Sequence, residues 1–270
     1  MEKITQAELN RKLELHKLWL EDTSKGKPLV LREADLRGAN FSNAYLSNIN
    51  FRGANFSNAD LIGANFRGAD LRGANLSKAN FRGADLRGAN FRGADLSNAD
   101  LSNANFKGAS LKYTNLRGAD LSKANFRGAN FRGADLRGAN FTNADLSNAD
   151  LRDANLRGAA LISADLRGAN LGNANLSNAD LSNTNLRDAG LFGTIGNSKE
   201  IKTYQFNPYI VVLCEDRVQI GCKNYSYDEW KSFVYAAISE MDDALVWGHK
   251  HKEIILQLSK LHQEEIVWKR

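Results

Sequence analysis

Residues 64–83 read ANFRGADLRGANLSKANFRG and contain four copies of one five-residue unit. The unit recurs without a break, because every fifth residue from Leu36 to Leu191 is Leu or Phe, at 32 positions in all. Ala stands two residues before 29 of these 32 positions. The three exceptions are Ile49, Thr114 and Thr184. The repeated unit Ala-(Asp/Asn)-(Leu/Phe)-(Arg/Ser)-(Gly/Asn) therefore determines the architecture of most of the chain.

A period of five matches neither the period of a helix, about 3.6 residues, nor that of a continuous strand, about two. The chain must therefore turn once in each unit, after a short extended piece. Strand alternation directs Ala and Leu/Phe to one side and the Asp or Asn between them to the other. Gly or Asn at the fifth position supplies the positive φ that a tight corner needs, so these glycines do not indicate a phosphate-binding loop.

Tandem A(D/N)LXX units such as Ala69-Asp70-Leu71-Arg72-Gly73 resemble the pentapeptide-repeat family. The resemblance covers residues 31–195 and implies a mainly β fold, a right-handed quadrilateral β-helix of about eight coils. In that family four units complete one square coil, so residues twenty apart stack about 4.8 Å from one another. The expected rod is about 40 Å long.

The boundaries of the repeats divide the chain into three expected parts. Pro28 and Pro208 are its only prolines, and they lie on either side of the repetitive stretch. We expect an N-terminal capping helix in residues 1–27, the β-helix in residues 28–195, and a small α+β domain in residues 196–270.

Charge and cysteine content limit the class of protein. The formal charge is +5, and residues 31–195 account for all of it with twenty basic and fifteen acidic residues. Both cysteines, Cys214 and Cys222, lie outside the repeats, and the N-terminus is too charged for a secretory signal. No apolar run approaches the roughly 18 residues that a membrane span needs. The sequence predicts a reduced, cytoplasmic protein without a membrane partner.

A four-sided coil would gather the cations of the repeats into files. One face carries a cation directly after its inward Leu or Phe in seven successive coils. This first file comprises Arg32, Arg52, Arg72, Arg92, Lys112, Arg132 and Arg152. The preceding face carries a second file, namely Arg67, Arg87, Lys107, Arg127, Arg167 and Arg187. Together the two files predict one basic side, whereas the face centred on Phe41, Leu61 and Phe81 is polar and slightly acidic.

Two interpretations of this basic side remain open. Like charges about 5 Å apart repel, so a file of cations needs local carboxylates or a polyanionic partner. Local pairing is available where Asp precedes the cation, as in Asp70 with Arg72. Asn50, Asn90 and Asn130 stand where that Asp would be needed, which leaves Arg52, Arg92 and Arg132 without it. Repeat duplication alone would also copy Arg at a constant position. The basic side is therefore either a solvated face without a ligand or a face that binds an anion or an acidic protein.

The N-terminal segment predicts a helix over residues 6–21. Thr5-Gln6-Ala7-Glu8 forms a capping box, and Leu9, Leu13, His16 and Leu20 follow at helical spacing. An open solenoid end exposes its apolar column and its unpaired strand edges, so we expect this helix to cover that end. His16 is then a packed or surface residue and not a ligand.

The C-terminal segment predicts two strands, Tyr209–Cys214 and Arg217–Cys222, followed by helices that begin near Ser226 and Asp242. Residues 220–230, IGCKNYSYDEW, resemble a short C-terminal module of bacteriophage proteins, which implies a phage or prophage source. The two cysteines with His249 and His251 could suggest zinc, but seven residues between the cysteines is not the usual close spacing of a structural site. We therefore predict no metal.

The function expected from these features is binding without catalysis. Residues 31–195 contain neither His nor Cys, so a nucleophile with a positioned base cannot be assembled there, and no cofactor is predicted. The leading interpretation is a protein-binding rod, a phage-type accessory protein acting on a host macromolecule, with a possible homodimer through the C-terminal domain.

Two alternatives belong to other classes. The family resemblance implies a DNA mimic that binds DNA gyrase or another type II topoisomerase, although such mimics are acidic and this rod is basic. The second alternative is direct contact of the Arg/Lys files with nucleic acid or another polyanion. No aromatic side chain interleaves with the cations of the first file before Tyr113, so stacking on bases is poorly supplied.

Overall fold

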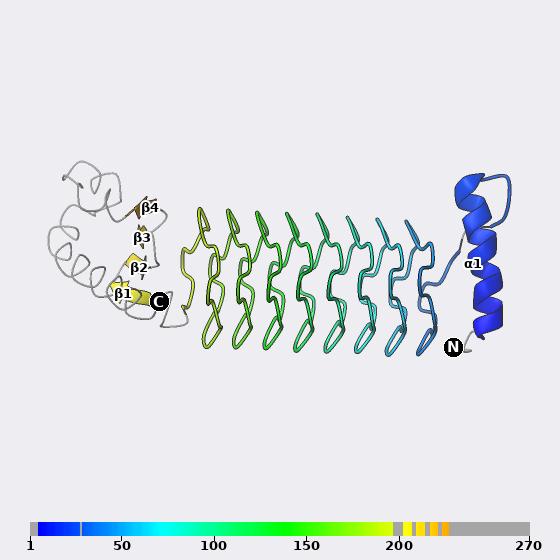
Figure 1. The fold of residues 1–270 in the computed structure, drawn as a ribbon, viewed down its shortest axis with the longest axis horizontal. Helices are drawn as coiled ribbons and strands as arrows, with labels where there is room; N and C mark the ends of the chain where they lie inside the picture. The colour runs from blue at the N-terminus through cyan, green and yellow to red at the C-terminus, as the bar shows by residue number, and fades with distance from the viewer. Residues whose placement is uncertain are drawn as a thin grey trace.

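The structure is a computed structural model that describes residues 5–27, 29–196, 202–206, 209–213, 217–220 and 223–226. One α-helix, α1 (Gln6–Glu21), lies across the N-terminal end of an elongated solenoid that is formed by the repeats (Figure 1). The bounds of α1 agree with the helix expected from the capping box and the apolar spacing. Among the described residues, no helix is long and apolar enough to cross a membrane.

Parallel bridges between residues twenty apart hold the solenoid together, from Val30 paired with Asn50 to Asn175 paired with Ile195. Each coil therefore takes four units, as expected. The inward residue of a unit donates its N–H to the coil above, as Leu71 does to the Asn90 carbonyl at 2.8 Å. The residue before it donates to the coil below, so the backbone of every inner coil is paired on both sides.

The core consists of stacked Leu/Phe and Ala columns, one of each for every face of the coil, that run the length of the solenoid. Most of the inward Leu and Phe are almost entirely buried, and so are most of the Ala residues that precede them by two positions. Near the two ends, Ala34, Ala39, Ala44 and Leu186 are half-buried. Phe106 and Phe126, one coil apart, stack with ring centroids 4.8 Å apart and planes 22° apart. Because each unit buries its apolar residues against other units of its own coil and of the neighbouring coils, the core is continuous and no unit has one of its own.

The three residues that replace Ala in the inward columns leave no hydroxyl without a hydrogen-bond acceptor. Ile49 is 2% exposed and fills the position with an apolar side chain. Thr114 is 1% exposed, and its hydroxyl donates to the Phe91 carbonyl at 3.0 Å. Thr184 donates likewise to Leu161 at 2.7 Å. Each buried hydroxyl therefore has an acceptor in the coil below, which removes the cost of burying a polar group.

Each corner is a turn whose third residue has positive φ. The inward carbonyl accepts the N–H three residues on, as Phe51 accepts from Ala54 at 2.9 Å. Gly53 between them has φ of 66°, the left-handed position that a type II turn requires. The Asn or Asp of the unit supports the turn, since Asn50 Oδ1 accepts the Arg52 N–H at 3.0 Å.

Helix α1 closes the first coil through both its apolar and its polar side chains. Leu9 is 1% exposed, and Leu13 packs against the same core. The Gln6 side chain donates to the Asn40 carbonyl at 2.9 Å and accepts the Asn40 N–H at 3.0 Å. This amide replaces the missing coil below Asn40, so the exposed strand edge is paired there. The helix caps the rod as expected.

His16 is a packed residue in this cap. Its ring is 2% exposed and its Nδ1 accepts the Leu29 N–H at 3.1 Å. Nε2 therefore carries the proton in the neutral ring, and it is buried without a hydrogen-bond partner among the described residues. Burial lowers the pKa of His16, and the nearby Ser47 backbone opposes this in part.

The C-terminal strands form a four-stranded antiparallel sheet in the order β1-β2-β3-β4. Their bounds are β1 (Lys202–Phe206), β2 (Tyr209–Leu213), β3 (Arg217–Ile220) and β4 (Lys223–Ser226). β2 and β3 lie within the two strands expected from the sequence, and they are paired antiparallel. β1 and β4 were not foreseen. The helices expected after Ser226, together with Cys214, Cys222, His249 and His251, lie outside the described residues.

Candidate binding surface

The charge of the rod is decided by the residue that stands two positions before each cation. The repeats contain six Asp-Leu-Arg triplets, and in all six the Arg Nε donates to the Asp Oδ1 at 2.8 or 2.9 Å. Both groups flank one inward Leu on the same outer surface, so they meet without any change in the backbone. Local pairing therefore neutralises Arg37, Arg72, Arg87, Arg137, Arg152 and Arg167.

The ion pairs lower the pKa values of the Asp carboxylates. The hydrogen bond from Arg72 holds the pKa of Asp70 below its ordinary value, although partial burial opposes the shift. Asp85, Asp135, Asp150 and Asp165 show the same lowered pKa for the same reason. Because the Arg side chains are about half exposed, these pairs add little stability, and their main effect is on surface charge.

Asn in place of Asp keeps the turn but not the charge pair. Asn90 Oδ1 accepts the Arg92 N–H at 3.1 Å, and Asn130 Oδ1 accepts the Arg132 N–H at 3.0 Å. The amide oxygen is thereby engaged, and the part of an Asn side chain that remains is its NH₂ group, which only donates. A repeat unit with Asn therefore exposes an amide NH₂ donor and a cation, without a carboxylate to pair with that cation.

A second carboxylate can reach a cation from the next coil, eighteen residues further along the chain. Arg52 and Arg67 help to lower the pKa of Asp70 and Asp85 in this way. Arg117 and Arg132 act likewise on Asp135 and Asp150. Each cation thus has two positions from which Asp can compensate it, one in its own unit and one in the coil above.

Five cations of the basic side lack Asp at both of these positions. Two of them, Arg32 and Arg187, form ion pairs with Glu33 and Asp188 of their own units instead. The other three have no such partner in the described part of the chain. Arg92 has Asn90 and Ser110, Lys107 has Asn105 and Asn125, and Lys112 has Ser110 and Asn130. No ion pair involves these three side chains within the residues that the structure describes. We call Arg92, Lys107 and Lys112 the uncompensated cluster. They occupy adjacent coils on the two neighbouring files, with Arg127 beside them.

Tyr113 lies in the middle of this cluster, directly after Lys112. It occupies the corner position with φ of 57°, where a bulky residue is strained. Its side chain is 57% exposed. The Arg92 guanidinium lies 5.8 Å from the ring centroid, and a Cβ on Gly133 would come within 2.7 Å of the ring. The ring therefore lies over Gly133 of the next coil, fixed between two repeats.

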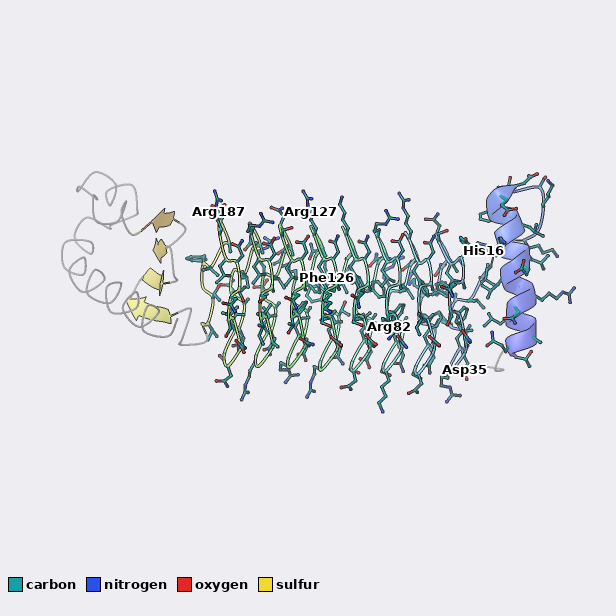
Figure 2. All side chains as sticks on the ribbon, viewed as in Figure 1. His16, Asp35, Arg82, Phe126, Arg127 and Arg187 are labelled. Atoms are coloured by element: carbon teal, nitrogen blue, oxygen red, sulfur yellow. The ribbon has the colours of Figure 1, made fainter. Side chains whose placement is uncertain are left out.

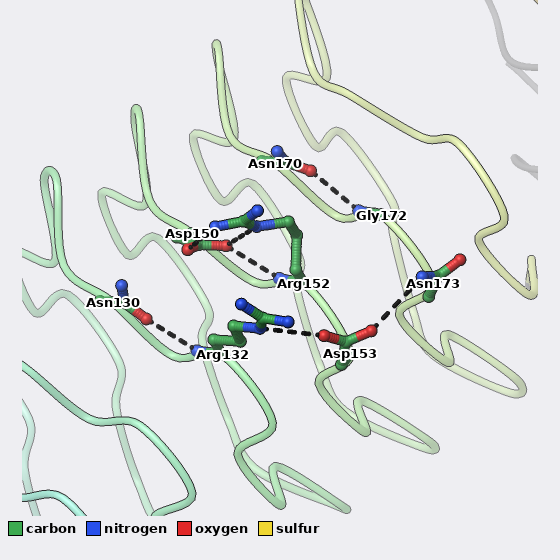
Figure 3. A network of polar contacts seen from close by, with 8 residues as sticks. All are labelled: Asn130, Arg132, Asp150, Arg152, Asp153, Asn170, Gly172 and Asn173. Atoms are coloured by element: carbon green, nitrogen blue, oxygen red, sulfur yellow. Dashed lines mark hydrogen bonds and ion pairs between the residues drawn. The ribbon is translucent and has the colours of Figure 1, made fainter. Parts of the chain in front are cut away.

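The C-terminal part of the first file is compensated by a different contact. Arg132 has Asn130 in its own unit, but its Nε donates to Asp153 Oδ2 at 3.1 Å (Figure 3). Asp153 occupies the corner position of the next coil, 21 residues away. Arg132 thus lacks the Asp of its own unit, as expected, but it has a carboxylate partner in the next coil, whereas Arg52 and Arg92 have no ion pair among the described residues.

The structure places the other predicted cations as follows. All residues of the two files are exposed except Lys112, which is half-buried. Figure 2 shows Arg127 and Arg187 of the second file along the same long edge of the solenoid. The face that follows the first file was not considered from the sequence, and it also carries cations. These are Arg37, Arg117, Arg137 and Arg157.

The fold and this surface define a class of protein, a capped β-solenoid with a patterned charged exterior. The family model for pentapeptide repeats matches eight copies between residues 30 and 191. The chain belongs to the pentapeptide repeat family, whose fold is the right-handed β-helix. The twenty-residue ladder agrees with that fold.

Several solved structures are similar to this chain. HetL, a protein involved in heterocyst differentiation regulation from the cyanobacterium Nostoc sp. strain PCC 7120, is 27% identical, with a TM-score of 0.40. The match covers 73% of this chain and 98% of HetL. Trypsin-treated QnrB1, a plasmid-mediated fluoroquinolone resistance protein, is 23% identical over 61% of this chain and 83% of its own, with a TM-score of 0.45. No curated protein matches the chain.

Proposed function

We propose that this protein is a non-enzymatic binding scaffold whose basic side binds an acidic protein. The uncompensated cluster is the observation that carries the proposal. Elsewhere on the basic side, each cation has an acidic residue in its own unit or in the next coil, which is Glu33 for Arg32 and Asp188 for Arg187. At the cluster this compensation is missing in two adjacent coils, where an acidic partner would supply it.

The chemistry of the rod supports binding in preference to catalysis. Residues 31–195 repeat the same few side chains and include neither His nor Cys. The carboxylates are engaged in turns and ion pairs, as Asp70 is by the Arg72 N–H and guanidinium. A stiff surface of this kind can position a partner, because its side chains are anchored on a backbone that is paired on both sides.

A topoisomerase partner is the second proposal, and it rests on family resemblance. The charge of the rod favours the first proposal, because a DNA mimic presents carboxylates where this chain presents Arg and Lys. The ladder also continues without an inserted loop from Val30 to Ile195. A supercoiling assay with DNA gyrase separates the two proposals. We expect neither inhibition nor protection from quinolones, and either effect would favour the second proposal.

The experiment for the first proposal is a comparative pull-down from bacterial lysate at low and at physiological salt. Wild-type protein should retain a protein partner in stoichiometric amount. The triple variant Arg92→Gln, Lys107→Gln, Lys112→Gln should lose it, because the charge is removed while the turns are kept. Retention by the triple variant, or no partner on the wild type, would count heavily against the proposal. The phage source and the C-terminal dimer stay predictions.

A further inference from the structure

We propose that the uncompensated cluster is the docking site for an acidic α-helix that lies along the axis of the rod. The proposal deepens the function proposed above and rests on it. It adds the secondary structure and the direction of the bound segment. Three features of the surface favour such a helix, namely its hydrogen-bond donors, the spacing of its cations and Tyr113.

The first feature is that the cluster presents donors almost without acceptors. The Oδ1 atoms of Asn90, Asn105 and Asn130 each accept a backbone N–H from the cation two residues later, at 3.0 or 3.1 Å. What these units offer outward is an amide NH₂ and a cation. Such a surface matches groups that only accept, above all carboxylates in their ionised form.

The acid-free stretch also has defined ends. On the first file, the residues between the cations run Asp70, Asn90, Ser110, Asn130 and Asp150. On the second file, Asp85 and Asp145 enclose Asn105 and Asn125. From Asp70 to Asp150 there are four coil steps, about 19 Å at the interstrand spacing. A bound acidic segment therefore has room for about three and a half helical turns.

The second feature is the spacing of the cations. Successive members of a file are one coil apart, about 4.8 Å along the axis. Acidic residues on one face of an α-helix recur every turn, at about 5.4 Å. The mismatch is about 0.6 Å per turn, which flexible Arg and Lys side chains can absorb over the length of the site. Carboxylates on one side of an extended strand recur at about 6.6 Å, and phosphates of one strand of duplex DNA at about 3.4 Å.

The third feature is Tyr113, which we assign as the apolar anchor beside the charges. It is an exposed aromatic side chain held in place by Arg92 on one side and Gly133 beneath it. Tyr, together with Trp and Arg, is enriched among the residues that dominate protein interfaces, and its rigid ring buries a large area at small entropic cost. Gly at this strained corner would serve the backbone ladder equally well, so the ladder does not explain why Tyr stands there.

The test uses two synthetic peptides of identical composition, each helical and about sixteen residues long. In the striped peptide, Glu recurs at i, i+4, i+7 and i+11 on one face. In the scrambled peptide, the same Glu residues are spread around the helix. Binding to the full-length protein is measured by fluorescence anisotropy, and oligo(dT) of equal charge is measured alongside.

We expect the striped peptide to bind about tenfold more tightly than the scrambled one, since three or four charge pairs form together. The triple variant Arg92→Gln, Lys107→Gln, Lys112→Gln should lose this preference. A matched control, Arg82→Gln, Lys123→Gln, Arg157→Gln, removes the same charge from other faces and should keep it. Tyr113→Gly should weaken the striped peptide more than the scrambled one.

Three outcomes would each reject a different claim, namely the helical form of the bound segment, its acidic protein nature, or the proposed function. Equal binding of both peptides, lost in the triple variant, would leave the basic side as a binding surface and reject the helix. Tighter binding of oligo(dT) than of either peptide would replace the acidic helix with single-stranded nucleic acid. If neither peptide binds at low salt, the proposed function itself fails together with the inference.

Discussion

The second residue of each repeat sets the charge that the fourth residue presents. With Asp70 or Asp150 in that position, the following Arg is held in an ion pair within its own unit. With Asn90 there, the same backbone turn forms, but Arg92 is left for another partner. A single atom exchanged for another in the side chain therefore changes surface charge without changing the fold.

Tyr113 is the residue where local strain and exposure coincide. We predict that Tyr113→Gly leaves the fold intact and raises the free energy of unfolding by up to about 1 kcal/mol, because Gly adopts positive φ without steric cost. Chemical denaturation followed by circular dichroism measures the change. A loss of more than about 1 kcal/mol would show that the ring contributes to the packing of the corner.

The buried His16 predicts an effect of pH on the N-terminal cap. Its pKa is lowered in the folded state, so the unfolded state binds more protons, and the stability of the cap rises with pH. The contribution is complete above the unfolded value of 6.5 and is lost as pH falls through the lowered folded pKa. Protonation of Nδ1 also removes the acceptor of the Leu29 N–H.

Hydrogen exchange of the Leu29 amide between pH 7 and pH 5 measures this opening, after correction for the intrinsic pH dependence of exchange. We expect protection to fall in the wild type. His16→Gln keeps an acceptor in the side chain but does not titrate, so its protection should stay level over the same range. Equal loss of protection in both proteins would contradict the role of His16.

At the scale of the element, α1 replaces a missing coil at one end of the ladder. The Gln6 amide makes two hydrogen bonds to the backbone of Asn40, as a neighbouring strand would. We predict that Gln6→Ala destabilises the cap by about 1 to 2 kcal/mol, because two backbone groups lose their partners. Asn10→Ala is the control on the same exposed face, because it removes only the contact from Gln6 at 2.8 Å.

The readout for this variant is thermal unfolding together with size-exclusion chromatography. Loss of the cap exposes a strand edge, so the Gln6→Ala protein should also associate more readily at high concentration. An unchanged melting temperature and an unchanged elution volume would indicate that Leu9 and Leu13 alone hold the helix in place.

Within the coils, the stacked aromatic residues are the most sensitive positions. Phe126 contacts Phe106, Phe131 and Phe141 in its own and neighbouring coils, with centroid distances from 4.8 to 5.9 Å. We predict that Phe126→Ala lowers stability by about 3 to 5 kcal/mol, since the rigid ladder cannot collapse into the cavity. Phe126→Leu should cost much less, because Leu occupies the inward position in many units.

Denaturant melts of Phe126→Ala also report on cooperativity. In a solenoid each coil contacts only its neighbours, so a defect in the middle weakens the coupling between the two halves. A broadened or two-step transition is therefore expected for Phe126→Ala and a single one for Phe126→Leu. A sharp transition in both would show that the halves remain coupled through the backbone ladder.

At the scale of the whole molecule, the paired carboxylates respond to acid in a different range from His16. The pKa values of Asp70, Asp85, Asp135, Asp150 and Asp165 are lowered by their Arg partners. Their stabilisation is complete above the unfolded value of 3.8 and is lost as pH falls through the folded pKa values. We therefore predict a second, small loss of stability below about pH 4, because each exposed pair contributes little.

Circular dichroism of the wild type and of His16→Gln from pH 7 to pH 2 separates the two ranges. Only the loss of stability in the lower pH range should persist in the His16→Gln protein. This loss should become steeper at low salt, because the released cations then repel one another more strongly. A loss confined to the range above pH 5 in both proteins would contradict the role assigned to the carboxylates.

Much of the fold follows from the sequence alone because the repeat encodes local geometry. The inward Ala and Leu/Phe columns, the positive φ of the fifth residue and the pairing of Asp70 with Arg72 all concern residues within one unit. The limits of α1 follow from the capping box and the apolar spacing. Strand alternation and turn chemistry act over a few residues, so the sequence is sufficient for them.

The binding surface needed the tertiary structure, because its contacts join residues from different coils. The bond from Arg132 to Asp153, the lowering of the pKa of Asp70 by Arg52, and the Tyr113 ring over Gly133 all cross between coils. Such contacts depend on which side chains the ladder brings side by side, and on the direction in which each side chain leans. The repeat determined the rod and its files of cations, and only the stacking of the coils decided which of those cations remain uncompensated.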